Sequence, residues 1–399
     1  MSKRIALGPV LALLCVAIVL SAVITGTTIK QKYNAMLAGL PEQAARYDIL
    51  DELEGILRAH YYGNSDNQAM RSAIAKGYIS GLPDGYSRYL TAKELRVYQS
   101  EANGEMQGVG VQCSRTAQGR IRVDDVIDGS PAQQQGIEPG DVIVSVDSIP
   151  VNASNYDEMI QKLKSDKSSI DLTVRGSEGE RTLTLSMGFE AASVVSDHYE
   201  DVGYLKLTSF YAGTAAQVKE IVDAFQQSGV QALVIDLRKN NSENVKYAMQ
   251  TLDVFVPLSE DPAARLVDQT GETVESFVTD AAAVNLPIAV LVSSGTQAAA
   301  ELFACDLRSF GKATLVGAKT GGLGLVRQAF QLSNGDAVLL CVGEMLPYRG
   351  ESFNGVGLEP DVAAAADEQA RSFKKDSVFL AAVSVLRGES ETTEGENGT

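Results

Sequence analysis

From residue 203 onward, short apolar runs alternate with longer amphipathic stretches, and this alternation limits the possible fold more than any other feature of the sequence. The runs VGYLKLTSF, VQALVIDLR and LPIAVLVSS have the nearly continuous apolar composition of buried strands. Between them, TAAQVKEIVDAFQQ and ENVKYAMQTLDVFV carry apolar side chains at helical spacing, and a further helix is expected from Gln297. Such alternation predicts an α/β fold in which helices cover a largely buried sheet.

Other patterns divide the rest of the chain. Residues 41–100 show helical periodicity interrupted by short polar breaks, which predicts a helical segment. Residues 101–189 contain short alternating strands and one helix-like stretch, NYDEMIQKLK, which predicts a compact β-rich domain. The α/β core is expected at 195–375. The acidic end, 388–399, is predicted to be disordered because it has almost no side chains to bury.

The N-terminal region contains a long uncharged run. Residues 5–29 follow Lys3 and Arg4 and are long enough, as a helix, to cross a bilayer. The positive-inside rule then places the N-terminus in the cytoplasm and the bulk of the chain outside it. We therefore expect a single-pass anchor at 1–30 and an extracytoplasmic location in the cell membrane. A cleaved signal peptide is the alternative, although residues 22–30 show no obvious cleavage site.

Charge and residue types exclude several classes of function. The net charge of −17 argues against nucleic-acid binding, which requires clustered lysine and arginine. The four cysteines have no metal-binding spacing, and neither of the two histidines, His60 and His198, belongs to a metal-ligand motif. We therefore expect no metal and no cofactor.

The β-rich region contains a specific motif. GEMQGVGVQC, followed by VIDGSPAQQQGIEPGDVIVSVDSIPV, resembles the PDZ domain over the length of that domain. The resemblance implies that peptide or protein C-termini bind there, with the terminal carboxylate on a loop of main-chain N–H groups. That loop would be formed by Gly108, Val109, Gly110 and Val111. The helix at 155–163 would form the opposite wall, with Met159 and Leu163 in the pocket. Alternatively, the glycines only permit a tight turn.

Motifs on both sides of this domain resemble a single family. GLPDGYSRYLTAKEL, VIDLRKNN, GTQAAAELFA, LVGAKTGGLG and GVGLEPDV resemble segments of the C-terminal processing peptidases, also called tail-specific proteases. The resemblance covers roughly residues 45–375, in the family's own order of helical segment, PDZ domain and protease core. It implies a core similar to the crotonase and Clp protease fold, with the PDZ domain inserted. It also implies a serine nucleophile and a lysine base.

The residues that would carry this chemistry are replaced. Aligned on Glu301, the family's catalytic serine falls on Ala298, its lysine on Leu323, and the glutamine that orients the lysine on Arg327. Alanine has no nucleophilic atom, and leucine cannot accept a proton. A guanidinium stays protonated, so it cannot act as the base either.

The expected oxyanion loop also departs from the family pattern. The family's D-L-R-x-N-x-G-G places a glycine so that its N–H faces the developing negative charge. Here the corresponding segment, DLRKNN, continues into Ser242 and Glu243. The change restricts the main chain and introduces a carboxylate near the place where negative charge would develop.

We therefore predict a pseudoprotease that binds C-termini through its PDZ domain and does not hydrolyse peptide bonds. One alternative is an active serine endopeptidase with a relocated dyad, because Ser294 and Lys319 are separated in sequence as Ala298 and Leu323 are. A second alternative is a scaffold or regulator that pairs with an active protease.

Overall fold

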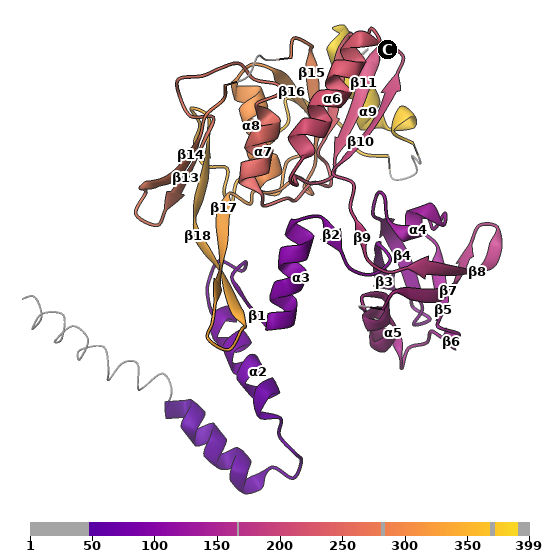
Figure 1. The fold of residues 1–399 in the computed structure, drawn as a ribbon, viewed down its shortest axis with the longest axis vertical. Helices are drawn as coiled ribbons and strands as arrows, with labels where there is room; N and C mark the ends of the chain where they lie inside the picture. The colour runs from indigo at the N-terminus through magenta and orange to yellow at the C-terminus, as the bar shows by residue number, and fades with distance from the viewer. Residues whose placement is uncertain (1–47, 166, 281–283, 368–371, 390–399) are drawn as a thin grey trace, which may run out of the picture. The chain divides into compact units, whose positions relative to one another are not determined.

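The structure is a computed structural model that describes residues 48–165, 167–280, 284–367 and 372–389 (Figure 1). It divides into two compact units, residues 1–71 and residues 72–399, which are considered separately. The predicted anchor at 1–30 and the tail from residue 390 lie outside the described residues.

The predicted membrane location requires correction. No helix within the described ranges is both long enough and apolar enough to cross a membrane. The longest of the numbered helices, α2 (Asn67–Ser80) and α6 (Thr214–Gln227), have 14 residues each. Each therefore spans about 21 Å, against a hydrocarbon core of about 30 Å. This finding contradicts the predicted single-pass location in the cell membrane, and we withdraw that prediction.

The first unit contains a helix over residues 48–60. The apolar side chains that predicted it, among them Ile49, Leu53 and Ile56, are exposed. Helix α2 crosses the boundary between the two units, because the second unit begins at Ser72, and it has no buried residue. Both helices were expected from the spacing of their apolar side chains, and several of these side chains, such as Ile74 and Tyr78 of α2, are exposed.

The centre of the second unit is a six-stranded sheet whose order is β10-β11-β12-β15-β16-β19. The strands are β10 (Val194–Tyr199), β11 (Val202–Leu207), β12 (Ala232–Asp236), β15 (Ile288–Val292), β16 (Ala313–Gly317) and β19 (Val362–Ala363). From β11 to β19 the strands run parallel, and β10 pairs antiparallel with β11. Strands β12 and β15 are buried along their whole length, as their continuous apolar runs predicted.

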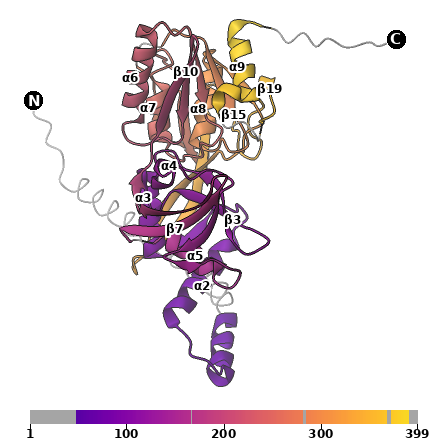
Figure 2. The same cartoon turned by 90° about the vertical axis from the view of Figure 1, so that its right-hand side faces the viewer.

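Helices cover both faces of this sheet (Figures 1 and 2). Helix α6 packs on one face with α7 (Val245–Leu252) and α8 (Ala299–Ser309), where alternate strand residues such as Leu233 and Ile235 point. The intervening residues, such as Val234, point to the opposite face and pack against α9 (Ser377–Arg387). The predicted α/β architecture is confirmed.

A second sheet joins segments far apart in the chain. Its order is β1-β18-β13-β14, and β17 also pairs with β18. The strands are β1 (Arg88–Leu90), β13 (Ala264–Asp268), β14 (Thr273–Phe277), β17 (Leu325–Gln331) and β18 (Ala337–Pro347). Helix α3 (Ala92–Ala102) follows β1 directly and begins with a capping box between Thr91 and Glu94.

The β-rich region forms a sheet with the order β3-β4-β5-β7-β8, and β6 pairs with β5. Its elements are β3 (Val111–Arg115), β4 (Ile121–Val126), α4 (Pro131–Gln134), β5 (Val142–Val146), β6 (Ile149–Pro150), α5 (Tyr156–Leu163), β7 (Ser169–Gly176) and β8 (Gly179–Ser186). It has its own hydrophobic core, and a short ladder of β2 (Glu105–Met106) and β9 (Phe189–Glu190) lies at its two chain ends. The boundary at 101–189 stays a prediction.

Candidate functional site

The candidate catalytic region lies where two adjacent parallel strands end. The loops after β12 and β15 leave the sheet at the same edge, because parallel strands present their carboxyl ends together. Side chains of the second loop bind the main chain of the first. Thr296 Oγ1 donates to the carbonyl of Leu237 at 2.9 Å, and Ser293 Oγ donates to that of Arg238 at 2.6 Å.

Ala298 stands at the turn into helix α8 in a rarely adopted conformation. Its φ is 55° and its ψ is −121°, and its side chain is completely buried. A residue other than glycine in such a region costs of order 1–3 kcal/mol, and such costs are often found at functional sites. The residue that precedes α8 therefore has a strained backbone, while its side chain is only a methyl group.

Leu323 is held in this region by Glu301. Within helix α8, the buried Glu301 carboxylate accepts the N–H of Ala298 at 3.2 Å, of Gly322 at 2.7 Å and of Leu323 at 2.8 Å. It also accepts the Thr320 hydroxyl. One carboxylate thus ties the turn at residue 298 to the segment 320–323. Ala298 and Leu323 are both buried in the same hydrophobic cluster.

The N–H groups that could bind an oxyanion are engaged by the protein itself. Ala299, which follows the predicted nucleophile position, donates its N–H to the carbonyl oxygen of Ser242 at 2.9 Å. Ser242 in turn donates its own N–H to Asn240 Oδ1 at 3.0 Å. The N–H of Ala299 is therefore already occupied by a carbonyl oxygen of the protein.

Arg327 pairs with Glu243, one of the residues that replaces the expected glycines. Arg327 Nε lies 2.9 Å from Glu243 Oε2, and a second guanidinium nitrogen contacts Oε1. Tyr98 of helix α3 donates its hydroxyl to the same carboxylate at 3.3 Å. These residues line a cavity of about 420 Å³ that also includes Arg88, Ser242 and Tyr211. Sequence reasoning noted the replacements at 243 and 327 separately and missed that they form a pair.

The alternative dyad, Ser294 and Lys319, makes other contacts. Lys319 Nζ lies 2.7 Å from Glu359 Oε1, and its side chain is 49% exposed. Ser294 is exposed in the loop before α8, and its carbonyl accepts from Gln297 Nε2 at 3.3 Å. Among the described residues, we find no hydrogen bond between Ser294 and Lys319.

The predicted carboxylate loop has unoccupied donors. The carbonyl oxygens of Gly108, Val109 and Gly110 accept N–H groups of the surrounding domain at 2.9 to 3.0 Å. Across the ranges that the structure describes, the N–H groups of these three residues donate no hydrogen bond. Gly108 and Gly110 have φ values of 81° and 83°, which favour glycine. Buried N–H groups without a partner are costly, so this loop is suited to receive an anion.

A groove of about 410 Å³ extends from this loop along β3 and α5, and we call it the peptide groove. Its apolar lining includes Val109, Val111 and Leu163, together with Ile127 and Ile160. Met159 is placed differently from the prediction. It is completely buried in the domain core, because its neighbour Ile160 occupies the groove-facing side of α5. Cys113 also lines the groove, and burial raises the pKa of its thiol to about 12.

No group of three or more histidine, cysteine, aspartate or glutamate side chains in the described part of the chain is arranged to hold a metal ion.

Comparisons with known proteins agree with the order of these parts. The profile of Peptidase family S41 matches residues 201–364, and that of the PDZ domain matches residues 122–176. A carboxy-terminal processing protease of Bacillus subtilis is 26% identical over 332 residues, covering 82% of this chain and 71% of its own. A probable CtpA-like serine protease of Staphylococcus aureus is 27% identical over 337 residues, covering 82% of this chain and 67% of its own.

Solved structures show the same fold. The photosystem II D1 C-terminal processing protease superposes with a TM-score of 0.54 and 22% identity, covering 86% of this chain and 92% of its own. Together with the Peptidase family S41 and PDZ matches, these likenesses support a C-terminal processing peptidase family with a PDZ domain. A putative S41 protease from Bacteroides fragilis superposes with a TM-score of 0.58 and 16% identity, covering 83% of this chain and 94% of its own. The predicted α/β peptidase core with a PDZ domain is thus confirmed, as an S41 peptidase fold, whereas the roles of individual site residues stay predictions.

Proposed function

We propose that this member of the C-terminal processing peptidase family binds peptide or protein C-termini through its PDZ domain without hydrolysing them. The observation that carries the proposal is the contrast between its two sites. Three N–H groups of the loop at 108–110 are unoccupied, whereas the N–H of Ala299 is already bonded to the Ser242 carbonyl.

Binding is supported by the groove beside the loop. A terminal carboxylate on the three N–H groups would leave the last side chain beside the apolar wall that includes Ile160 and Leu163. The main chain of the bound peptide can then extend along β3 by strand addition. The absence of cleavage is supported by the buried methyl group of Ala298 and by the side chain of Leu323, which has no proton-accepting atom.

The binding test uses the full chain and a fluorescein-labelled decapeptide with a free C-terminus. A twin with a C-terminal amide is the control, because it keeps every side chain and lacks only the terminal charge. We expect fluorescence anisotropy to show Kd at least tenfold higher for the amide. Equal affinities would contradict carboxylate recognition.

The cleavage test incubates the full chain with unfolded casein and follows fragments by gel electrophoresis. We expect no fragments. Cleavage that disappears in a Ser294→Ala variant would overturn the proposal in favour of the relocated dyad.

A further inference from the structure

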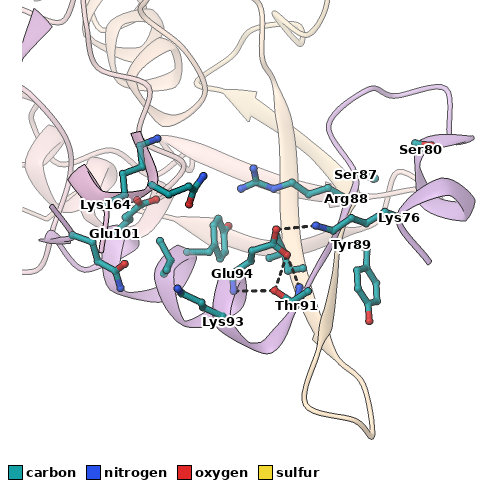
Figure 3. Close-up of a pocket in the computed structure, with 15 residues that line it drawn as sticks. Lys76, Ser80, Ser87, Arg88, Tyr89, Thr91, Lys93, Glu94, Glu101 and Lys164 are labelled. Carbon is teal, nitrogen blue, oxygen red and sulfur yellow. Dashed lines mark hydrogen bonds and ion pairs between the residues drawn. The ribbon is translucent and has the colours of Figure 1, made fainter. Parts of the chain in front are cut away.

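A second cavity adjoins the peptide groove at the carboxylate loop. Its volume is about 720 Å³, and it lies among α2, β1, α3 and the end of α5 (Figure 3). It shares Gln107 and Lys164 with the groove, as well as two residues of α3, Val97 and Glu101. Lys164 lies directly beside the loop, because a Cβ atom on Gly108 would be 3.4 Å from the Lys164 Cα. The two cavities therefore meet where a bound peptide would end.

The lining of this cavity is basic, although the whole chain carries a net charge of −17. Four cations line it, Lys76, Arg88, Lys93 and Lys164, against two carboxylates, Glu94 and Glu101. We call it the basic cavity.

Only one of these four cations is neutralised by an ion pair. Lys76 Nζ lies 2.9 Å from Glu94 Oε1, as Figure 3 shows. Within the described residues, Arg88, Lys93 and Lys164 make no ion pair. Arg88 lies over the ring of Tyr98, 5.8 Å from its centroid, which places a guanidinium in the wall of the cavity without neutralising it. Glu101 is the one remaining carboxylate of the lining against these three cations, so the basic cavity carries a net positive charge that attracts an anion.

We propose that the basic cavity recognises an acidic side chain within the last two residues of a bound C-terminus, so that this protein prefers acidic chain ends. The inference rests on the proposed binding of C-termini. A peptide is the fitting ligand because the basic cavity shares Lys164 with the peptide groove, and Lys164 lies beside Gly108, where the terminal carboxylate would bind. The terminal carboxylate would lie on the loop, and the acidic side chain would reach into the basic cavity.

The test measures the affinities of two pairs of labelled decapeptides by fluorescence anisotropy on the full chain. One pair ends in Glu-Leu and Gln-Leu, and the other ends in Leu-Glu and Leu-Gln; all four have a free C-terminus. Partly exposed charge pairs contribute up to about 1 kcal/mol, which corresponds to about fivefold in Kd. We expect the acidic member of at least one pair to bind about fivefold more tightly at low salt. We expect this preference to shrink below twofold at about 0.5 M salt.

Variants assign the preference to the cavity. The double variant Arg88→Gln/Lys164→Gln is expected to reduce the preference for the acidic peptide over its glutamine twin, taken as the ratio of the two Kd values, below twofold. Lys375→Gln removes an exposed lysine that does not line the cavity and is expected to keep the full preference.

The outcomes separate this inference from the proposed function. If both members of each pair bind equally and far better than an amidated twin, the acidic preference is wrong and carboxylate recognition stands. If an acidic preference persists in the double variant, the basic cavity is not its source. If free and amidated peptides bind alike, the proposed function fails, and the inference fails with it.

Discussion

Replacing Glu301 by glutamine tests whether one carboxylate holds the turn at Ala298 and the segment 320–323 together. Each of its oxygens accepts two donors: Oε1 accepts the Thr320 hydroxyl and the Gly322 N–H, and Oε2 accepts the N–H groups of Ala298 and Leu323. A glutamine side chain has one oxygen and one NH₂ group, so two of the four donors would face another donor.

The size of the effect follows from the number of donors left without an acceptor. A buried polar group without a partner costs about 1–3 kcal/mol, so two such groups should lower the free energy of unfolding by about 2–6 kcal/mol. This is a large part of the 5–15 kcal/mol typical of folded proteins. Glu359→Gln is the matched control, because it makes the same chemical change in an ion-paired side chain that is 70% exposed. It should change stability by about 0.5 kcal/mol or less.

Urea unfolding followed by circular dichroism measures both variants. We expect a lower midpoint for Glu301→Gln with an unchanged slope, and a midpoint close to the parent for Glu359→Gln. A Glu301→Gln protein within 1 kcal/mol of the parent would refute the assignment of Glu301 as the group that holds the turn and the segment 320–323.

Three further predictions follow from other described residues. Burial raises the pKa of the Asp306 carboxyl well above 3.8, and its Oδ2 has no partner among the described residues. The folded state therefore holds this proton more tightly, and its stabilising effect is complete at low pH and lost as the pH rises through the folded pKa. Thermal unfolding should accordingly show that Asp306→Asn has a free energy of unfolding about 1–3 kcal/mol above that of the parent at pH 8, and equal to it near pH 3.5. A variant that is less stable than the parent at pH 8 would contradict this. The double variant Ala298→Ser/Leu323→Lys should still leave casein intact, because the Ser242 carbonyl continues to occupy the N–H of residue 299. Casein fragments on a gel would contradict this and show that the side chains at 298 and 323 alone prevent cleavage. Gly110→Ala should raise the Kd of a free-carboxylate peptide, measured by fluorescence anisotropy, at least tenfold, because the new Cβ would lie 2.1 Å from the Cβ of Ser130. Gly179→Ala is the control: its φ is also positive, its surroundings are open, and it should keep the parent affinity. Equal effects of the two variants would mean that the loop does not form the site.

Much of the core fold could be predicted from local pattern. The strands β12 and β15 and the helices between the strands were visible because apolar periodicity reports which face of an element is buried. The second sheet was not predicted. Strand β18 pairs with β1, so that Leu90 faces Ala337 across almost 250 residues of chain, and no local pattern reports such a pairing.

The candidate site was predicted in part. The replacements at 298 and 323 were evident from motif alignment, and the structure adds the backbone angles of Ala298 and the Glu301 contacts. The groove wall was predicted one residue out of register on α5, with Met159 where Ile160 lies. On an α-helix, the side chains of adjacent residues point in directions about 100° apart around the helix axis. A small error in the predicted rotation of the helix therefore exchanges a core residue for a residue that lines the groove.

The sequence by itself determined which atoms are available: no hydroxyl at Ala298, no amine at Leu323, and glycines where the loop at 108–110 needs positive φ values. These are properties of single residues, so no fold is needed to read them. Only the tertiary structure decided that the Ser242 carbonyl occupies the Ala299 N–H and that Glu243 meets Arg327. It alone brought cations from α2, β1, α3 and the end of α5 around one cavity. Each of these arrangements depends on contacts between segments distant in the chain, which packing determines and local sequence does not.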